Sequence, residues 1–94
     1  MALDWDDGNR DKCQKHGVSL GEIEEFFAGE PRFAPDRKHD QVEARFIAVG
    51  RTLAGRALFV AFTFRRIDGR DRIRPISARY MHKQEVERYE QESP

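Results

Sequence analysis

The chain has 94 residues, a formal net charge of zero and one cysteine, with 38% hydrophobic and 36% charged residues. This length fits one domain, residues 1–94, with a thin core, and the single Cys13 excludes an internal disulfide and a cysteine-based zinc site. No apolar run approaches the roughly 20 residues that span a bilayer and the acidic start does not resemble a signal peptide, so we expect a cytoplasmic protein.

A short helix is predicted first, over residues 8–16. Asp6 or Asp7 can cap its N-terminus, and Gly17 follows its end, where a positive φ is favourable. We expect Cys13 to face the core from this helix.

A second helix is predicted over residues 20–28. Ser19 and Glu22 have the spacing of a capping box, in which each side chain binds the other residue's backbone N–H. Gly29 and Pro31 then end the helix. Its apolar stripe consists of Ile23, Phe26 and Phe27.

Four strands and a final helix complete the predicted order. The strands are expected at residues 32–35, 43–50, 56–66 and 71–79, and the helix at 81–91. Short connections favour an antiparallel sheet, with the helices collected on one of its faces. Asp68-Gly69 predicts a tight hairpin between the last two strands. Pro75 cannot donate a ladder hydrogen bond, so we expect it at an edge or a bulge.

Alternation along this hairpin predicts one apolar and one polar face. The apolar face, expected under the helices, carries Leu58, Val60, Phe62 and Phe64. The opposite face carries Ala57, Ala61, Thr63 and Arg65. Strict alternation also places Ile73, Pro75, Ser77 and Arg79 on one face. We therefore expect a shallow polar face lined by arginine.

Positive charge gathers in the strands. Residues 43–79 carry nine arginines and three acidic residues, a net charge of +6, whereas residues 1–30 carry a net charge of −5. An arginine-rich face suits an anionic polymer, although arginines also keep strand edges soluble.

Cleavage of RNA would use such a face. Attack by a 2′-hydroxyl forms a highly charged phosphorane, which guanidinium groups stabilise with paired hydrogen bonds, and Glu43 or His39 could move the protons. Phosphate binding without catalysis needs the same arginines, so a non-catalytic module that binds a partner or a nucleic acid is the alternative. The three histidines are far apart in sequence, so we expect no metal site.

Several short motifs occur together in a characteristic order. They are Trp5-Asp6, Lys15-His16-Gly17-Val18-Ser19, Glu43-x-Arg45-Phe46, Gly50 and Ile76-Ser77-Ala78-Arg79. With this order and spacing, residues 3–91 resemble the BrnT family of bacterial toxins. The resemblance implies an α+β, RelE-like fold with two N-terminal helices, a four-stranded antiparallel sheet and a C-terminal helix.

The resemblance also implies a function. It indicates a ribonuclease toxin of a type II toxin–antitoxin system that inhibits translation by cleaving RNA and is neutralised by a cognate BrnA-like antitoxin. Operator DNA would be bound only through the antitoxin, and no cofactor, metal or membrane is expected. The functional positions that the resemblance implies are Lys38 or His39, Glu43, Arg45, Arg65 and Arg79. Together with Ser77 on the polar face of the hairpin, they give Arg79, Arg65, Glu43 and His39 as the expected catalytic residues and Arg45, Lys38 and Ser77 as the expected RNA-binding residues. A one-residue bulge would exchange Arg65 for Arg66.

Overall fold

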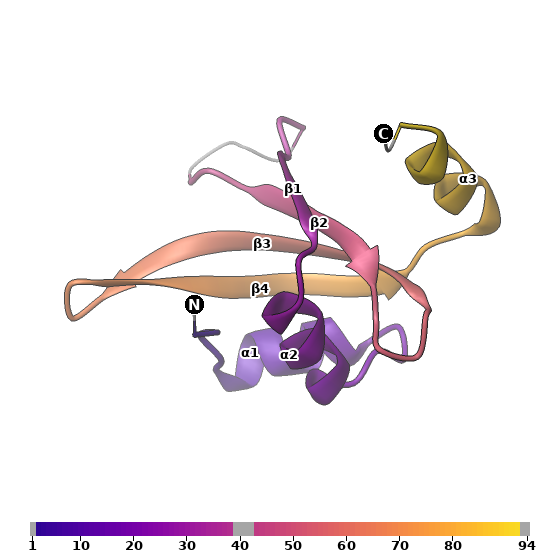
Figure 1. Ribbon diagram of the computed structural model, residues 1–94. Helices are drawn as coiled ribbons and strands as arrows, with labels where there is room; N and C mark the ends of the chain where they lie inside the picture. Colours follow the sequence, from indigo (N-terminus) through magenta and orange to yellow (C-terminus); the bar gives the residue numbers. More distant parts are fainter. Residues whose placement is uncertain (1, 39–42, 93–94) are drawn as a thin grey trace.

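The computed structural model describes residues 2–38 and 43–92 (Figure 1). Its elements, in chain order, are α1 (Asp7–Gln14), α2 (Leu20–Ala28), β1 (Arg32–Pro35), β2 (Phe46–Arg51), β3 (Ala57–Ile67), β4 (Arg70–Tyr80) and α3 (Lys83–Glu92). The strands form one antiparallel sheet in the order β1-β2-β3-β4. The predicted α+β class and antiparallel topology are therefore confirmed.

Both N-terminal helices begin with a capping box. Asp6 caps α1 by accepting a hydrogen bond from the backbone N–H of Asn9, while the Asn9 side chain accepts one from the N–H of Asp6. Ser19 and Glu22 form the predicted capping box of α2. The first helix ends at Gln14, two residues earlier than predicted, and the chain then turns through Gly17.

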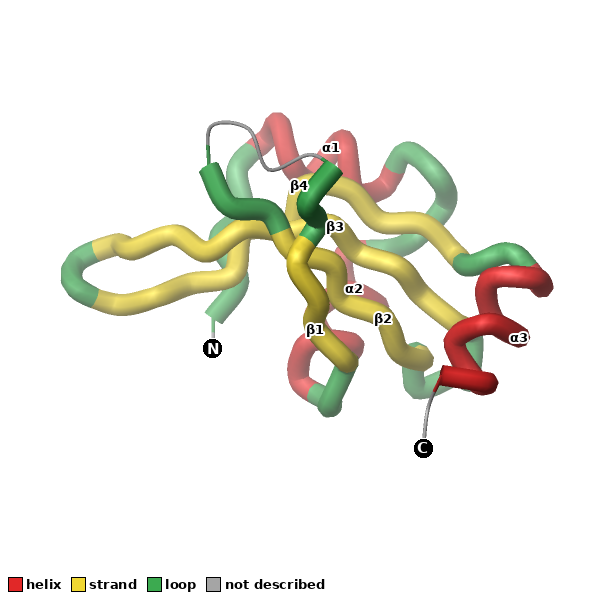
Figure 2. The backbone as a smooth tube through the Cα atoms, turned by 90° about the horizontal axis from the view of Figure 1, so that it is seen from above, coloured by secondary structure: helices red, strands yellow, loops and turns green. Residues whose placement is uncertain are grey.

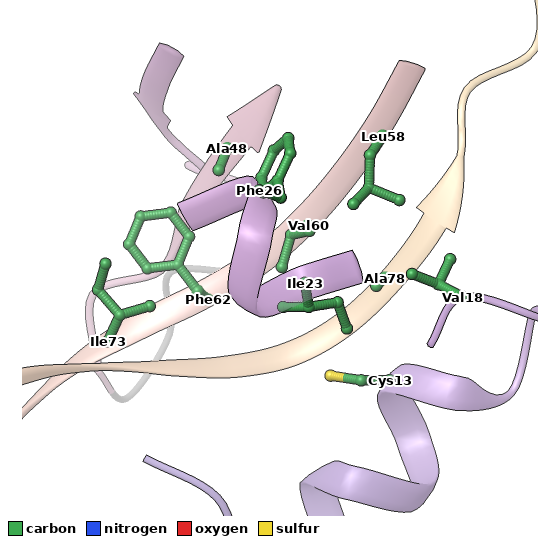
Figure 3. Close-up of a cluster of buried hydrophobic side chains, with 10 residues drawn as sticks. All are labelled: Cys13, Val18, Ile23, Phe26, Ala48, Leu58, Val60, Phe62, Ile73 and Ala78. Atoms are coloured by element: carbon green, nitrogen blue, oxygen red, sulfur yellow. The ribbon is translucent and has the colours of Figure 1, made fainter. Parts of the chain in front are cut away.

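The core lies between these two helices and one face of the sheet, which we call the core face (Figure 3). Its members are Cys13, Val18, Ile23, Phe26, Ala48, Leu58, Val60, Phe62, Ile73 and Ala78. Cys13 is fully buried, as predicted, and burial raises the pKa of its thiol to about 11. Because Leu58, Val60 and Phe62 are all buried, the predicted apolar side of β3 is the core face.

The hairpin of β3 and β4 extends beyond the other strands (Figures 1 and 2). Its turn has positive φ at both Asp68 (51°) and Gly69 (76°), which matches the predicted tight hairpin. Pro75 lies on the edge strand β4 beside a bulge, as predicted: Ala61 pairs with Ser77 and Phe62 with Pro75, so Ile76 has no partner across the ladder.

The bulge corrects the predicted faces of β4. Strict alternation put Ile73 and Pro75 on the face of Ser77 and Arg79. One extra residue reverses the alternation, so Ile73 and Pro75 are buried on the core face while Ser77 and Arg79 lie on the opposite face, which we call the open face.

The position of α3 also differs from prediction. The helices were expected on one face, yet α3 lies across the sheet from α1 and α2, at the end of the open face (Figure 1). There it borders Val49 and Phe59. Because α3 buries no residue of its own, it does not need to cover the core face. It is held instead mainly by ion pairs with Arg51 and Arg79. No helix in the described ranges has the length and apolar content needed to cross a bilayer.

Candidate functional site

The open face contains a hollow of about 750 Å³. Its walls come from α1, from the segment that follows β1, and from strands β2, β3 and β4. The lining residues are Lys12, Pro35, Asp36, Arg37, Lys38, Arg45, Ile47, Phe59, Ala61, Ile76, Ser77 and Arg79. Five of these side chains are cationic and one is a carboxylate, so the hollow suits an anionic ligand.

Small residues at the centre of the sheet leave room for this hollow. Ala61 on β3 pairs with Ile47 on one side and with Ser77 on the other, so two short side chains lie next to each other on the open face. The bulge adds Ile76 to the same face, and Phe59 completes an apolar floor. The cations stand around this floor, which is the arrangement expected for a nucleotide with a charged backbone and an aromatic base.

Arg79 is the most firmly held cation of the hollow. Its guanidinium lies over the Phe59 ring, 4.4 Å from the centroid, and donates two hydrogen bonds to the carboxylate of Glu85 on α3, at 2.7 and 2.9 Å. The hydrogen bond to Glu85 raises the pKa of Arg79, and the same hydrogen bond lowers the pKa of Glu85 to about 2. The pair is therefore ionised throughout the physiological range.

The pair with Glu85 does not use all the donors of Arg79. A guanidinium has five N–H groups in one plane, and Glu85 accepts from one on each terminal nitrogen. Three donors stay available, while Phe59 and Glu85 together fix the orientation of the plane. Arg79 is thus pre-organised to bind a second oxyanion without a change of rotamer.

Two other predicted RNA-binding residues lie on the far wall of the hollow. Arg45 precedes β2, and its carbonyl accepts a hydrogen bond of 2.8 Å from the N–H of Asp36, which ties the segment after β1 to the start of β2. Lys38 lies in that segment and is exposed. The structure therefore brings together Lys38 from the segment after β1, Arg45 from the start of β2, and Ser77 and Arg79 from β4.

The other predicted residues are not part of this group. Arg65 lies on the extended hairpin, exposed and paired across the ladder with Arg72. It is four positions beyond Ala61, the hollow residue of β3 nearest to it, which corresponds to about 13 Å along a strand. Arg66, the alternative to Arg65, pairs with Asp71 near the turn and does not line the hollow either.

Neither of the two predicted proton-transfer residues is placed in the hollow by the structure. Glu43 is exposed ahead of β2 and is not among the residues that line the hollow. His39 lies outside the described residues. Within the ranges that the structure describes, no three His, Cys, Asp or Glu side chains are grouped so that they could hold a metal ion.

Sequence reasoning missed several residues of the site. Phe59 was left out although alternation from Ala57 and Ala61 places it on the open face. No sequence pattern marked Lys12, Asp36 or Arg37 as site residues. Only the folded chain brings α1 and the segment after β1 to the hollow. Glu85 could have been noticed as the third residue of a helix that starts after His82, since its side chain also accepts from the His82 backbone N–H.

The fold and the hollow together define a small α+β domain with a cation-lined hollow on its open sheet face. The comparison with protein families is more specific. The family model described as the ribonuclease toxin BrnT of type II toxin–antitoxin systems matches residues 5–85, so the chain belongs to the BrnT family. The protein is therefore a ribonuclease toxin, and its class implies an RNA substrate and an antitoxin partner. None of the curated proteins matches the chain.

Proposed function

We propose that the hollow is the place where this toxin cleaves RNA, as an endoribonuclease that needs no metal ion. One observation carries the proposal: Lys38, Arg45 and the β4 pair Ser77 and Arg79 converge on one hollow, although more than 30 residues separate this pair from the other two. The cations supply, as fixed charge, the stabilisation that a metal ion supplies in other nucleases.

In the proposed reaction the 2′-oxygen attacks the adjacent phosphorus and the bond from phosphorus to the 5′-oxygen breaks. The products are a 2′,3′-cyclic phosphate and a free 5′-hydroxyl. The three available N–H groups of Arg79 stabilise the equatorial oxygens of the phosphorane, because its charge is largest there. Arg45, Lys38 and Ser77 hold the backbone on either side, and Phe59 borders the space for a base.

Two protons must move in this reaction, one from the 2′-hydroxyl and one to the 5′-oxygen. We assign this task to Glu43 or His39, as the sequence suggested, and add Asp36, the described carboxylate that lines the hollow. Arg65 then has no direct contact with the reacting phosphate and binds the RNA strand farther out along the hairpin.

The biological role follows from this chemistry. Cleavage of RNA would inhibit translation in the cytoplasm, and a BrnA-like antitoxin would neutralise the toxin and carry the contacts to operator DNA. The whole chain would act as a single toxin domain, since the family match covers residues 5–85 of 94.

The test is cleavage of total RNA in the presence of a chelator. Arg79→Lys removes the planar fork but keeps the charge, and we expect it to slow cleavage by about a hundredfold. The matched control is Arg51→Lys, because Arg51 also pairs with a glutamate of α3 but does not line the hollow. Equal cleavage by wild type and Arg79→Lys, or loss of all cleavage with chelator, would contradict the proposed mechanism.

A second candidate function is RNA binding at the hollow without cleavage. It is favoured by one observation, the occupation of two Arg79 donors by Glu85. Under this alternative the wild type would retain RNA in a filter-binding assay and leave it intact for hours, with or without ribosomes. Arg79→Lys would then weaken binding and change nothing else.

A further inference from the structure

Five phenylalanines form a continuous surface on the core face, which we call the aromatic surface. They are Phe27, Phe33, Phe46, Phe62 and Phe64, with neighbouring ring centroids 4.9–6.2 Å apart. Phe62 is fully buried, but Phe33 is 49% exposed and Phe64 is 37% exposed. The apolar core thus continues outward into solvent along this face.

The helices leave this surface uncovered because they are too short to follow the sheet. Phe27, next to the end of α2, is the last helical side chain that contacts the cluster. Beyond it the hairpin of β3 and β4 continues past the helices, and residues 2–4 pair with Ile73 along the outer edge of β4 (Figure 1). Single exposed apolar residues are common on protein surfaces, but rings joined edge to face indicate an interaction site.

Positive charge follows directly after the rings. Along β3, Phe62, Phe64 and Arg66 share one face. The arm of the hairpin, residues 65–74, carries five arginines and two aspartates, a net charge of +3, but Arg65 and Arg72 are ladder partners on the open face and Arg74 pairs with Asp4 and Asp6. Arg66 is thus the arginine of the arm that follows the rings on the core face. The pair of Arg66 with Asp71 is exposed on both sides, so it contributes little and can be exchanged for a partner's carboxylate.

We infer that the antitoxin docks on the aromatic surface, with apolar side chains over Phe33 and Phe64 and an acidic residue at Arg66. The inference rests on the antitoxin partnership of the family and not on the cleavage residues. Two partly exposed rings, Phe33 and Phe64, form a narrow apolar strip, much smaller than the roughly 800 Å² per partner of a stable globular interface. A strip of this kind suits one segment that folds on binding and continues towards Arg66, rather than a second copy of this chain.

The aromatic surface and the hollow lie on opposite faces of the sheet. Phe33, Phe64 and Arg66 do not line the hollow, so antitoxin binding through these side chains can be separated from RNA cleavage. A variant of the aromatic surface should cleave RNA normally and escape neutralisation.

The first experiment measures the affinity of the toxin for the protein encoded by the adjacent gene, by titration calorimetry. Phe33→Ser and Phe64→Ser should each raise Kd by about tenfold or more, as expected for aromatic anchors. The matched control is Leu53→Ser, since Leu53 is 83% exposed in the turn after β2 and should leave Kd unchanged. Cleavage of RNA by the free variants should equal that of the wild type.

Three results would overturn the inference. The first is an unchanged Kd for both phenylalanine variants, and the second is an equal loss for Leu53→Ser. The third is a wild-type dimer that Phe64→Ser dissociates while antitoxin binding persists, because a second copy would then be the occupant. If the wild type and Arg79→Lys cleaved RNA equally, the proposed cleavage site would be wrong, but this inference would still stand. The two outcomes can be told apart because Kd is measured without RNA.

A second experiment tests the charged arm and does not depend on the stability of the serine variants. Arg66→Glu should slow antitoxin association by about tenfold, and the wild-type association rate should fall as salt is raised, because steering by charge is screened. An association rate that is independent of both salt and Arg66→Glu would contradict an acidic partner on the arm.

Discussion

The two helices before the sheet and the one helix after it contact the same sheet by different means. α1 and α2 insert Cys13, Ile23 and Phe26, all buried, into the core face. α3 buries no residue of its own. One layer is therefore held by removal of apolar surface from water, and the other element mainly by charged groups.

The contacts of α3 are few and mostly exposed. Glu85 pairs with Arg79, Glu90 pairs with Arg51, and Arg32 lies over the Tyr89 ring at 5.4 Å from its centroid. Ion pairs of this kind are worth at most about 1 kcal/mol each and weaken with salt. We infer from this difference that α1 and α2 supply most of the stability of the domain. The contribution of α3 is to hold arginine side chains, chiefly Arg79, in place on the open face.

The largest expected effect is loss of Phe62, which lies at the centre of the apolar layer. Phe62→Ala should lower the free energy of unfolding by about 3–5 kcal/mol, enough to unfold a domain of this size. Its control on the other element is Val86→Ala in α3, where the half-buried side chain should cost less than about 1 kcal/mol. Urea denaturation of both variants checks this, and similar losses would remove the distinction between the two elements.

A buried amide connects the helix layer to the bulge. Asn9 is only 4% exposed, and its Nδ2 donates to the carbonyls of Asp4 and Pro75, both at 2.9 Å. Asn9→Ala leaves the Pro75 carbonyl unsatisfied and removes half of a capping box, so we expect a loss of about 2 kcal/mol. Asn9→Asp keeps the acceptor for the Asp6 N–H but loses the Nδ2 donor, so its melting temperature should fall by a similar amount. If both variants melted at the wild-type temperature, the amide would not be needed for stability.

Local patterns predicted most of the fold, for reasons that the structure makes clear. Capping boxes and the Asp68-Gly69 turn are decided by residues within a few positions of one another, so α2 and the hairpin were placed correctly. The bulge at Ile76 depends on the pairing of two strands, and alternation along β4 alone could not reveal it. The position of α3 depends on side chains from three strands and was likewise not predicted.

The candidate site was predictable to a similar extent. Arg45, Ser77 and Arg79 were singled out within motifs of the chain and share the hollow. Arg65 was grouped with them because it shares the face of Ala61, but it lies about 13 Å farther along the hairpin. Distance along a strand, rather than the choice of face, separated it from the others.

The N-terminal cap of α2 should make a smaller contribution to stability than the buried side chains of the helix layer. The Ser19 hydroxyl accepts a hydrogen bond of 3.1 Å from the Glu22 N–H. Ser19→Ala should cost about 1 kcal/mol and Ser19→Asp much less, because aspartate also caps well. Denaturant midpoints of the two variants would show the difference, and equal midpoints would mean that packing alone positions α2.

The smallest expected effect concerns the Glu85–Arg79 pair, which should make the attachment of α3, but not that of α1 and α2, depend on pH. The pKa of Glu85 is lowered from 4.5 to about 2, chiefly by its hydrogen bond with Arg79. A lowered folded-state pKa gives stability that is complete above pH 4.5 and is lost as the pH falls towards 2. Both side chains are about one-third exposed, so solvent screening limits the contribution to about 1 kcal/mol or less.

NMR titration of the carboxyl carbons can follow this pair directly. Glu85 should titrate near pH 2 in the wild type and close to its ordinary pKa in Arg79→Gln, and the helical chemical shifts of α3 should weaken below pH 3 while those of α1 and α2 persist. The matched control is Glu87→Gln, an exposed residue of α3 that should leave the Glu85 titration unchanged. Activity gives a second readout: Glu85→Gln removes a negative charge beside the proposed cleavage site but also loosens Arg79, so KM should fall while kcat falls several-fold. A variant that changed KM alone would show that Glu85 only repels the substrate and that Phe59 suffices to orient Arg79.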